Sequence, residues 1–298
     1  MRACSCPARR GTLPISARSR SQGRGMLPLL RPREWRYRVA GGLSAGLMCA
    51  GTICWGGTSS RHQAKPGGAM SPSLSLALIG IVLQTAFIQC DRSRRYGLAA
   101  VLKGLASLAF ALLGLWGALK GGQAGGASVA SSLVCLGLAC GAVGDVLHAL
   151  RFVQPVKRVA THLFMSGAVS FFLGHVAYLG ALVPPCPMPG IPLLLAAVAV
   201  AVVFAVLGPR IRLRGTRRAS GVAYLGAVVC VASFAIVGFL SQPSPSRLAF
   251  ALGGMLFAVS DTLLAINSFG GGSTTGRRVV SLSTYYVAQL LIAGSLWL

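Results

Sequence analysis

Long apolar runs, each close to 20 residues, recur along the chain from residue 72 to its end. A helix needs about 20 mainly apolar residues to cross the hydrocarbon core of a bilayer. Short segments rich in Gly, Pro, Ser and Arg separate the runs, as is typical of connections between helices. The pattern predicts eight membrane-spanning helices, at 72–90, 97–119, 128–150, 160–182, 189–208, 219–240, 246–268 and 279–298.

Composition supports the same class of protein. Hydrophobic residues make up 54% of the 298 residues and charged residues only 11%, whereas soluble domains average roughly 25% charged residues. A β-barrel would need strands of about 10 residues with alternating polarity, and these runs are longer and apolar on all sides. We therefore expect an all-α membrane protein, a bundle of about eight transmembrane helices.

Residues 1–71 differ from the remainder and form a separate N-terminal extension. They contain 12 of the 28 Lys and Arg residues but a single acid, Glu34. An Arg- and Ser-rich, acid-poor segment resembles an organelle transit peptide. Equal alternatives are a disordered basic extension, or an upstream start with Met70 as the functional initiator. The apolar stretch at 39–57 fits either a signal-like segment or an additional span. The predicted eight-helix domain covers residues 72–298.

The net charge of +24 comes mainly from Lys and Arg residues in the loops and in the N-terminal extension. Connections after predicted spans one, three, five and seven carry 3, 3, 5 and 2 Lys or Arg residues, and those after spans two, four and six carry 1, 0 and 1. The positive-inside bias places the first set on the cytosolic side. Because the basic residues are scattered over separate loops, we expect no nucleic-acid partner.

Acidic residues are the rarest chemical feature of the chain. There are four, Glu34, Asp91, Asp145 and Asp261, and the last two fall inside apolar runs. An ionised carboxylate at bilayer depth costs a few kcal/mol, so such residues usually face a cavity or a partner and indicate a functional site. Asp145 and Asp261 are therefore the primary candidate site residues.

Other polar residues lie in the same half of the predicted spans. At 1.5 Å of rise per residue, Asp145 and Asp261 lie ~8 and ~10 Å from the cytosolic ends of their spans. Residues at comparable depth are Lys103, Tyr285, Tyr286 and Gln289. His175 lies deeper, at ~22 Å. Except for this histidine, the depths predict one polar chamber that opens toward the cytosol.

The two aspartates also occupy matching contexts. LGLACGAVGDVLHAL (136–150) and LGGMLFAVSDTLLAI (252–266) agree at seven of fifteen positions when Asp145 is aligned with Asp261. Spans three and seven run in the same direction, which is compatible with two parallel four-helix repeats.

An ordered set of motifs resembles the lysoplasmalogenase family of multi-span membrane proteins, also called the YhhN-like family. The motifs are LACGAVGDVLHAL, MSGAVSFFLGHVAYLGAL, GGMLFAVSDTLLAINSF and LSTYYVAQLLIAG, within about residues 72–298. One departure is Lys103, which Gly104 follows where the family usually has Pro.

The resemblance implies an enzyme that hydrolyses the vinyl ether bond of lysoplasmalogens, with a fatty aldehyde and a glycerophospho-base as products. Such a bond opens when an acid protonates its β-carbon and water captures the resulting oxocarbenium ion. Two carboxyl groups suffice, as in glycosidases. From their flanking residues, Asp145, beside Gly144 and Val146, is the better candidate for the acid, and Asp261, beside Ser260 and Thr262, is the better solvated candidate for the base. The sequence leaves the reverse assignment open.

The remaining candidates are expected to orient the carboxyl groups or bind substrate: His175, Tyr285, Tyr286, Gln289, Ser260 and Lys103. Each has an alternative role. His175 fits a hydrogen bond between helices, the tyrosines fit interfacial aromatics, and Lys103 fits a side chain that extends to the cytosolic surface. Adjacent helical positions point about 100° apart, so one of the two tyrosines is expected to face the site.

Other chemistries have weaker support. The histidines show no HxxxH or HExxH spacing and the nine Cys residues no CxxC spacing, so we expect no metal, cofactor or disulfide framework. The competing functions are a proton-coupled transporter, since intramembrane Asp and His also form proton relays, and a non-catalytic protein that binds ether lipids. Family resemblance favours the endoplasmic reticulum membrane, while the N-terminal segment keeps a plastid or mitochondrial membrane open.

Overall fold

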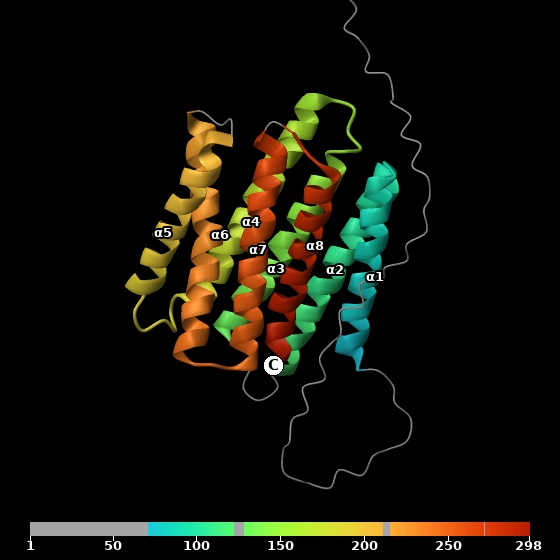
Figure 1. Cartoon of the computed structure of the whole chain (residues 1–298). Helices are drawn as coiled ribbons and strands as arrows, with labels where there is room; N and C mark the ends of the chain where they lie inside the picture. Colours follow the sequence, from blue (N-terminus) through green and yellow to red (C-terminus); the bar gives the residue numbers. More distant parts are fainter. Residues whose placement is uncertain (1–70, 122–127, 211–214, 271) are drawn as a thin grey trace, which may run out of the picture. The chain divides into compact units, whose positions relative to one another are not determined.

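The computed structural model describes residues 71–121, 128–210, 215–270 and 272–298, and within them eight α-helices follow one another without strands (Figure 1). The helices are α1 (Pro72–Arg92), α2 (Tyr96–Gly121), α3 (Val129–Leu150), α4 (Lys157–Leu182), α5 (Gly190–Leu207), α6 (Thr216–Ser241), α7 (Pro245–Phe269) and α8 (Thr275–Gly294). Short 3₁₀ turns, η2 (Gly208–Arg210) and η3 (Ser295–Trp297), follow α5 and α8.

Every one of these eight helices is long and apolar enough to cross a membrane. The predicted helical class and all eight spans are therefore confirmed, and the chain is a multi-pass integral membrane protein. The N-terminal extension, with the further span considered at 39–57, lies outside the described residues except for Ser71.

Local sequence signals determine where several helices begin. Ser71 and Ser244 each precede a proline, and their hydroxyls accept hydrogen bonds from the amides of Leu74 and Arg247. Ser128 caps α3 in the same way. Such caps satisfy amide groups that have no partner within the helix, and proline is well tolerated in a first helical turn.

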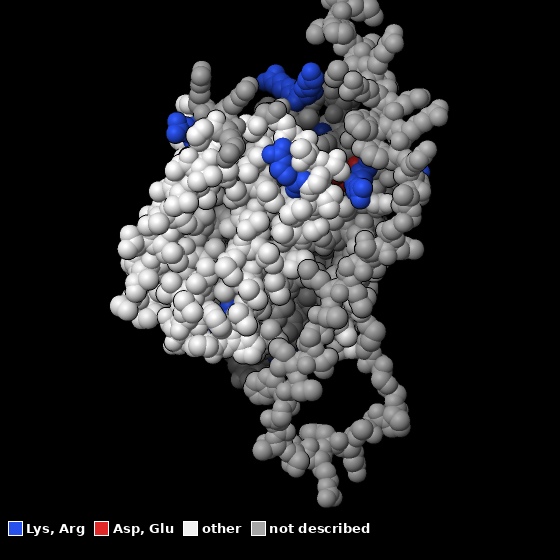
Figure 2. Space-filling view, in the orientation of Figure 1, with Lys and Arg blue, Asp and Glu red and all other residues white. Residues whose placement is uncertain are grey.

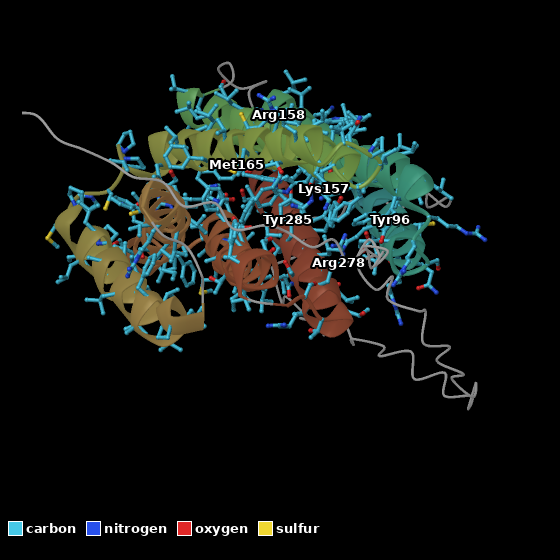
Figure 3. The ribbon with its side chains drawn as sticks, turned by 90° about the horizontal axis from the view of Figure 1, so that it is seen from above. Tyr96, Lys157, Arg158, Met165, Arg278 and Tyr285 are labelled. Carbon is cyan, nitrogen blue, oxygen red and sulfur yellow. The ribbon has the colours of Figure 1, made fainter. Side chains whose placement is uncertain are left out.

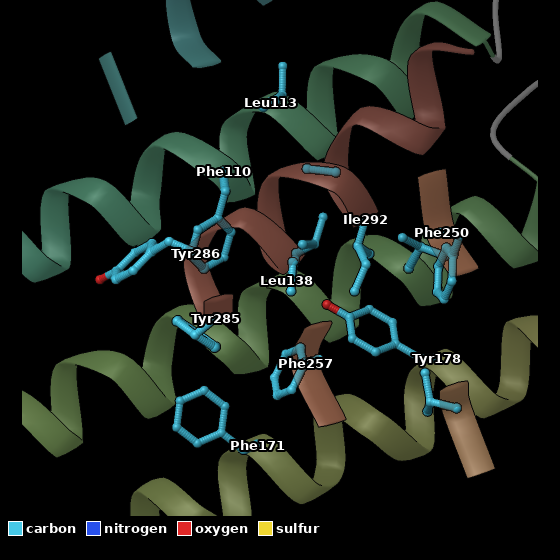
Figure 4. Packing of buried hydrophobic residues seen from close by; sticks show 14 of the residues in the cluster. Phe110, Leu113, Leu138, Phe171, Tyr178, Phe250, Phe257, Tyr285, Tyr286 and Ile292 are labelled. Atoms are coloured by element: carbon cyan, nitrogen blue, oxygen red, sulfur yellow. The ribbon is translucent and has the colours of Figure 1, made fainter. Parts of the chain in front are cut away.

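The bundle exposes aliphatic side chains and buries aromatic and polar ones. Val82, Leu119 and Leu194 are more than half exposed, as expected where a helix faces lipid rather than water. Phe110, Tyr286, Leu138 and Ile292 are almost completely buried at the centre, where Figure 4 shows their packing.

The two halves of the bundle have corresponding helix neighbours. In each half consecutive helices contact one another, and α3 with α4 and α7 with α8 form the most extensive pairs. The halves meet where α2 contacts α8 and where α4 contacts α6, which are equivalent pairs if α5–α8 repeat α1–α4. The least buried helices, α1 and α5, lie at opposite edges (Figure 1). These neighbours are compatible with two parallel four-helix repeats, although α8 also contacts α1 and α3, and α4 makes no equally extensive contact with α5 or α7 among the described residues.

Basic side chains gather at one end of the bundle, at the top of Figure 2. This end holds the C-terminal ends of α1, α3, α5 and α7 and the N-terminal ends of α2, α4, α6 and α8. We call it the basic end. Lys120 and Arg247 belong to the opposite end.

Candidate functional site

Asp145 lies in the centre of the bundle with three donors around it. Its side chain is 1% exposed. Ser107 of α2 donates a hydrogen bond of 2.5 Å to Asp145 Oδ2, and Tyr285 of α8 donates one of 2.8 Å to the same oxygen. Lys103 Nζ lies 2.9 Å from Oδ1, which has no hydrogen-bond partner besides this ion-pair contact. The carboxylate is therefore surrounded by a cation and two hydroxyl donors from other helices.

A second row of polar groups holds these donors in place. Gln289 Nε2 donates to Tyr285 OH at 3.1 Å, and Tyr178 of α4 donates to Gln289 Oε1 at 3.1 Å. Tyr286 OH lies 3.4 Å from the Lys103 carbonyl oxygen and 3.5 Å from Ser107 Oγ. Of the two candidate tyrosines, Tyr285 contacts the carboxylate, and Tyr286 contacts its neighbours.

Small residues on α3 allow the rings and the amide to approach Asp145. A Cβ on Gly141 would lie 2.5 Å from Gln289 Nε2, and a Cβ on Gly144 would lie 2.9 Å from the ring of Phe171. These glycines precede Asp145 by four residues and one residue, so α4 and α8 can pack directly beside the carboxylate.

Asp261 of α7 has simpler surroundings. Its carboxylate is 8% exposed and accepts, among the described residues, one hydrogen bond, of 2.6 Å from Tyr224 of α6. No described cation forms an ion pair with it. The flanking hydroxyl groups are not directed at it, because Ser260 donates to the Ser281 carbonyl at 2.8 Å and Thr262 to the Ala258 carbonyl at 2.8 Å. The structure therefore does not bring the candidate Ser260 to the carboxylate.

His175 lies between the surroundings of the two aspartates. Its Nδ1 is 2.7 Å from the Phe171 carbonyl oxygen, whereas the buried Nε2 has no hydrogen-bond partner among the described residues. The imidazole ring is 4.5 Å from the ring of Phe257 and 5.9 Å from that of Tyr224, the donor to Asp261.

Aromatic rings lie between the residues around Asp145 and the residues around Asp261; we call these two sets the aspartate clusters. Phe257, one turn before Asp261, lies 5.3 Å from Tyr285, the donor to Asp145, and 4.5 Å from His175. Figure 4 shows Phe257, Tyr285 and Phe171 together in this region.

His175 lies deeper in the bundle than Asp145, in agreement with the depth counted from the sequence. Ser170 of α4 donates to the Cys140 carbonyl oxygen at 2.7 Å, and a Cβ on Gly174 would lie 3.0 Å from the Gly137 carbonyl oxygen. The backbone of His175 is therefore near the level of Gly137, eight residues before Asp145, which is ~12 Å along a helix.

A cavity of about 650 Å³ opens beside Lys103 at the basic end. Residues near the ends of α1, α2, α3, α4, α7 and α8 line it. Figure 3, which views the structure from above, shows Tyr96 of α2, Lys157 of α4 and Arg278 of α8 around this region, together with Tyr285. Because Lys103 lines the cavity and also pairs with Asp145, it joins the cavity to the polar groups around Asp145. Lys103 is 7% exposed and so does not extend to the surface.

Several residues of these clusters were missed in the sequence. Ser107, Tyr178 and Tyr224 are single hydroxyl groups in apolar runs, and Arg151 and Arg278 fall in predicted loops or loop borders. Loop arginines were interpreted only as topology signals, although both line the cavity.

The two carboxyl groups have different surroundings. Asp145 has a cation and two hydroxyl donors, and Asp261 has one hydroxyl donor in an otherwise buried position. Two inequivalent carboxyl groups can divide the roles of general acid and general base. The polar neighbours of Asp261 along the chain, Ser260 and Thr262, donate to backbone carbonyls and not to its carboxylate.

The sequence model of the YhhN family matches residues 71–296. No curated protein and no solved structure matches the chain. The matched segment includes all eight described helices and both aspartate clusters.

Proposed function

The chain belongs to the YhhN family, which includes lysoplasmalogenases, and from this membership and its two inequivalent carboxyl groups we propose that it hydrolyses the vinyl ether bond of lysoplasmalogens. The substrates are 1-alkenyl glycerophosphoethanolamine or glycerophosphocholine, and the products are a fatty aldehyde and the glycerophospho-base. The observation that carries the proposal is the contrast between Asp145, paired with Lys103, and Asp261, bonded to Tyr224. Residues 72–298 form the enzyme domain, so a chain that begins at Met70 is expected to retain aldehyde release.

The reaction starts with protonation of the vinyl ether. Asp261 donates its proton to the β-carbon, the double-bond electrons form the new C–H bond, and an oxocarbenium ion results. The Asp145 carboxylate stabilises this cation and takes a proton from the attacking water, whose oxygen bonds to the α-carbon to give a hemiacetal. Asp145 then returns the proton to the glycerol oxygen as the C–O bond breaks. The hemiacetal hydroxyl proton passes to Asp261, which restores both groups.

Neighbouring residues act through these two groups. Lys103, Ser107 and Tyr285 fix the orientation of Asp145, and Gln289 holds Tyr285. His175 Nε2, which has no hydrogen-bond partner among the described residues, accepts a hydrogen bond from the attacking water or from the hemiacetal, which would satisfy a buried polar atom.

The first experiment compares two lipids with the full-length protein in liposomes. A 1-alkenyl lysophospholipid is expected to release aldehyde, and the saturated 1-alkyl analogue is not. When the reaction runs in D₂O and the aldehyde is trapped by reduction to the alcohol, the product is expected to carry one deuterium on the former vinyl β-carbon. Absence of aldehyde from the folded parent would overturn the proposal.

Variants test the two-carboxyl mechanism. Asp145→Asn and Asp261→Asn are each expected to lower the rate by at least ~10²-fold, the scale of general acid–base catalysis. Full activity of either variant would remove that residue from the mechanism. Proton-driven uptake of a solute in the same liposomes would instead favour a transporter. Helices α3 and α7 continue unbroken through the aspartates, whereas transporter sites are typically formed by discontinuous helices.

A further inference from the structure

The cavity at the basic end carries an excess of positive charge. Its lining contains the basic residues Lys103, Arg151, Lys157 and Arg278 and one acid, Asp91. Arg278 donates to both oxygens of Asp91, at 2.6 and 2.7 Å, which neutralises that acid. An anion is the ligand that such a lining favours.

Two guanidinium groups share one aromatic ring within the cavity. The guanidinium carbons of Arg151 and Arg278 each lie 4.5 Å from the ring centroid of Phe152. Arg151 forms no ion pair with any described carboxylate. Burial, followed by the neighbouring charge of Arg278, lowers the pKa of Arg151 to about 10, so it remains charged at neutral pH. The guanidinium group of Arg151 is well suited to bind a phosphate through bidentate hydrogen bonds, and Arg278, whose Nε and Nη2 donate to Asp91, retains Nη1 as a donor beside it.

The position of Arg151 matches the dimensions of the proposed substrate. Arg151 follows Asp145 by six residues, which is ~9 Å along a helix. In a lysoplasmalogen seven bonds separate the phosphorus from the vinyl β-carbon, which is ~9 Å in an extended chain of bonds close to 1.5 Å. A phosphate at Arg151 would therefore bring the vinyl ether to the level of Asp145.

A second polar group in the cavity lacks a partner. Asn267 of α7 lines the cavity, and its Oδ1 is buried without a hydrogen bond to any described residue. The glycerol of a lysolipid carries a free hydroxyl group that can both donate and accept, so it would satisfy this amide in either orientation.

Together these observations point to a ligand with a phosphodiester next to a hydroxylated glycerol. We propose that the cavity is the binding site for the glycerophospho headgroup of the lysolipid, with Arg151 and Arg278 on the phosphate and Asn267 on the free glycerol hydroxyl. This inference rests on the proposed function for the identity of the lipid, and it assigns the residues that discriminate phospholipids from lipids without phosphate.

Binding of lipids that cannot be hydrolysed tests the site without turnover. The full-length protein in detergent is titrated with a 1-alkyl lysophospholipid and with the matching 1-alkylglycerol, which lacks the phosphate. Arg151→Gln is expected to weaken binding of the lysophospholipid about tenfold, as expected for loss of a charge-assisted hydrogen bond, and to leave the alkylglycerol unchanged. Arg158→Gln is the matched control, because Arg158 is exposed at the same end and does not line the cavity.

Steady-state kinetics distinguish the proposed headgroup site from the proposed reaction. With a 1-alkenyl lysophospholipid, Arg151→Gln is expected to raise KM about tenfold with kcat within twofold of the parent, and Arg151→Lys to recover part of the loss. A parent that binds the lysophospholipid as described but releases no aldehyde would refute the reaction and leave the binding site standing.

Other results would overturn the headgroup site. Equal losses for the lysophospholipid and the alkylglycerol, or parental affinity for both, would show that Arg151 does not bind the phosphate. In a third titration, inorganic phosphate alone is added to the full-length protein and to the Arg151→Gln variant. If it binds in an Arg151-dependent manner and the lysophospholipid does not, the cavity is a site for free phosphate rather than for a lipid.

Discussion

Two adjacent tyrosines on α8 differ in what their hydroxyl groups bind. Tyr285 donates to Asp145 at 2.8 Å, and Tyr286 makes contacts of 3.4 and 3.5 Å to Lys103 and Ser107. Loss of a buried hydrogen bond to a charged group costs about 1.5–3 kcal/mol. We expect Tyr285→Phe to lower kcat at least ~10-fold and Tyr286→Phe to stay within about threefold of the parent, measured as aldehyde release. Equal effects of the two substitutions would contradict a specific role for Tyr285.

The Lys103–Asp145 ion pair leads to a prediction about stability. Removing one partner of a buried pair leaves an unbalanced charge and costs roughly 3–5 kcal/mol. Lys103→Met is therefore expected to lower Tm, and addition of Asp145→Asn is expected to restore more than half of the loss, although both variants lack activity. Thermal unfolding in detergent gives Tm for the parent, the two single variants and the double variant, which together form a double-mutant cycle. A double variant as unstable as the sum of the single variants would show that the two charges do not interact.

At the scale of single residues, charged and polar residue types that are rare in apolar runs could be identified from the sequence. The residues that form hydrogen bonds with them could not. Asp145, Lys103 and Tyr285 were identified because charged and amphipathic groups are unusual in apolar runs. Ser107 and Tyr224 were missed, since a hydroxyl group in a span is common and acquires its partner only when α2 packs on α3 or α6 on α7. Ser260 was selected for being next to Asp261, but adjacent helical side chains diverge by about 100°, and its hydroxyl binds a carbonyl of α8.

At the scale of the helices, close approach of α3 and α4 depends on Gly137. A Cβ at this position would overlap the ring of Tyr178, which is 1% exposed and has no space into which to move. Overpacking of this kind costs about 1–3 kcal/mol. Gly137→Ala is therefore expected to lower Tm in detergent and to reduce activity, because Tyr178 supports Gln289.

Gly226 on α6 provides the matched control. Nothing lies within 4 Å of a Cβ built there. Since alanine is a better helix former than glycine by about 0.8–1 kcal/mol, Gly226→Ala is expected to preserve or raise Tm. A Gly137→Ala protein as stable as the parent would mean that α3 and α4 do not require this contact.

The helices themselves were predictable because their signal is local. About 20 apolar residues in sequence determine a span, and the observed helices overlap all eight predicted runs. Their neighbours were not predictable in this way. The contacts of α2 with α8 and of α4 with α6 join segments far apart in the chain. The alignment around Asp145 and Asp261 indicated only that α3 and α7 occupy equivalent positions.

At the scale of the whole molecule, the distribution of charge predicts the orientation in the membrane. Arg92, Arg151, Lys157 and Arg278 lie at the basic end, and residues at this end line the cavity. Figure 3 labels Lys157 and Arg278 there. By the positive-inside bias we expect this end to face the cytosol. Helix α8 starts there, so the C-terminus lies at the opposite end (Figure 1).

Protease protection in sealed vesicles with the cytosolic side outward tests this orientation. A tag at the C-terminus is expected to resist added protease until detergent opens the vesicles, because the bilayer shields it. A tag inserted after Gly272, in the connection between α7 and α8, is expected to be cleaved without detergent. The reverse pattern would place the cavity on the other side of the membrane, and the substrate would then have to reach the protein from the non-cytosolic leaflet. Since charge at the basic end is what directs the chain, neutralising Arg92, Arg94 and Arg95 together is expected to increase the fraction of molecules with an exposed C-terminal tag.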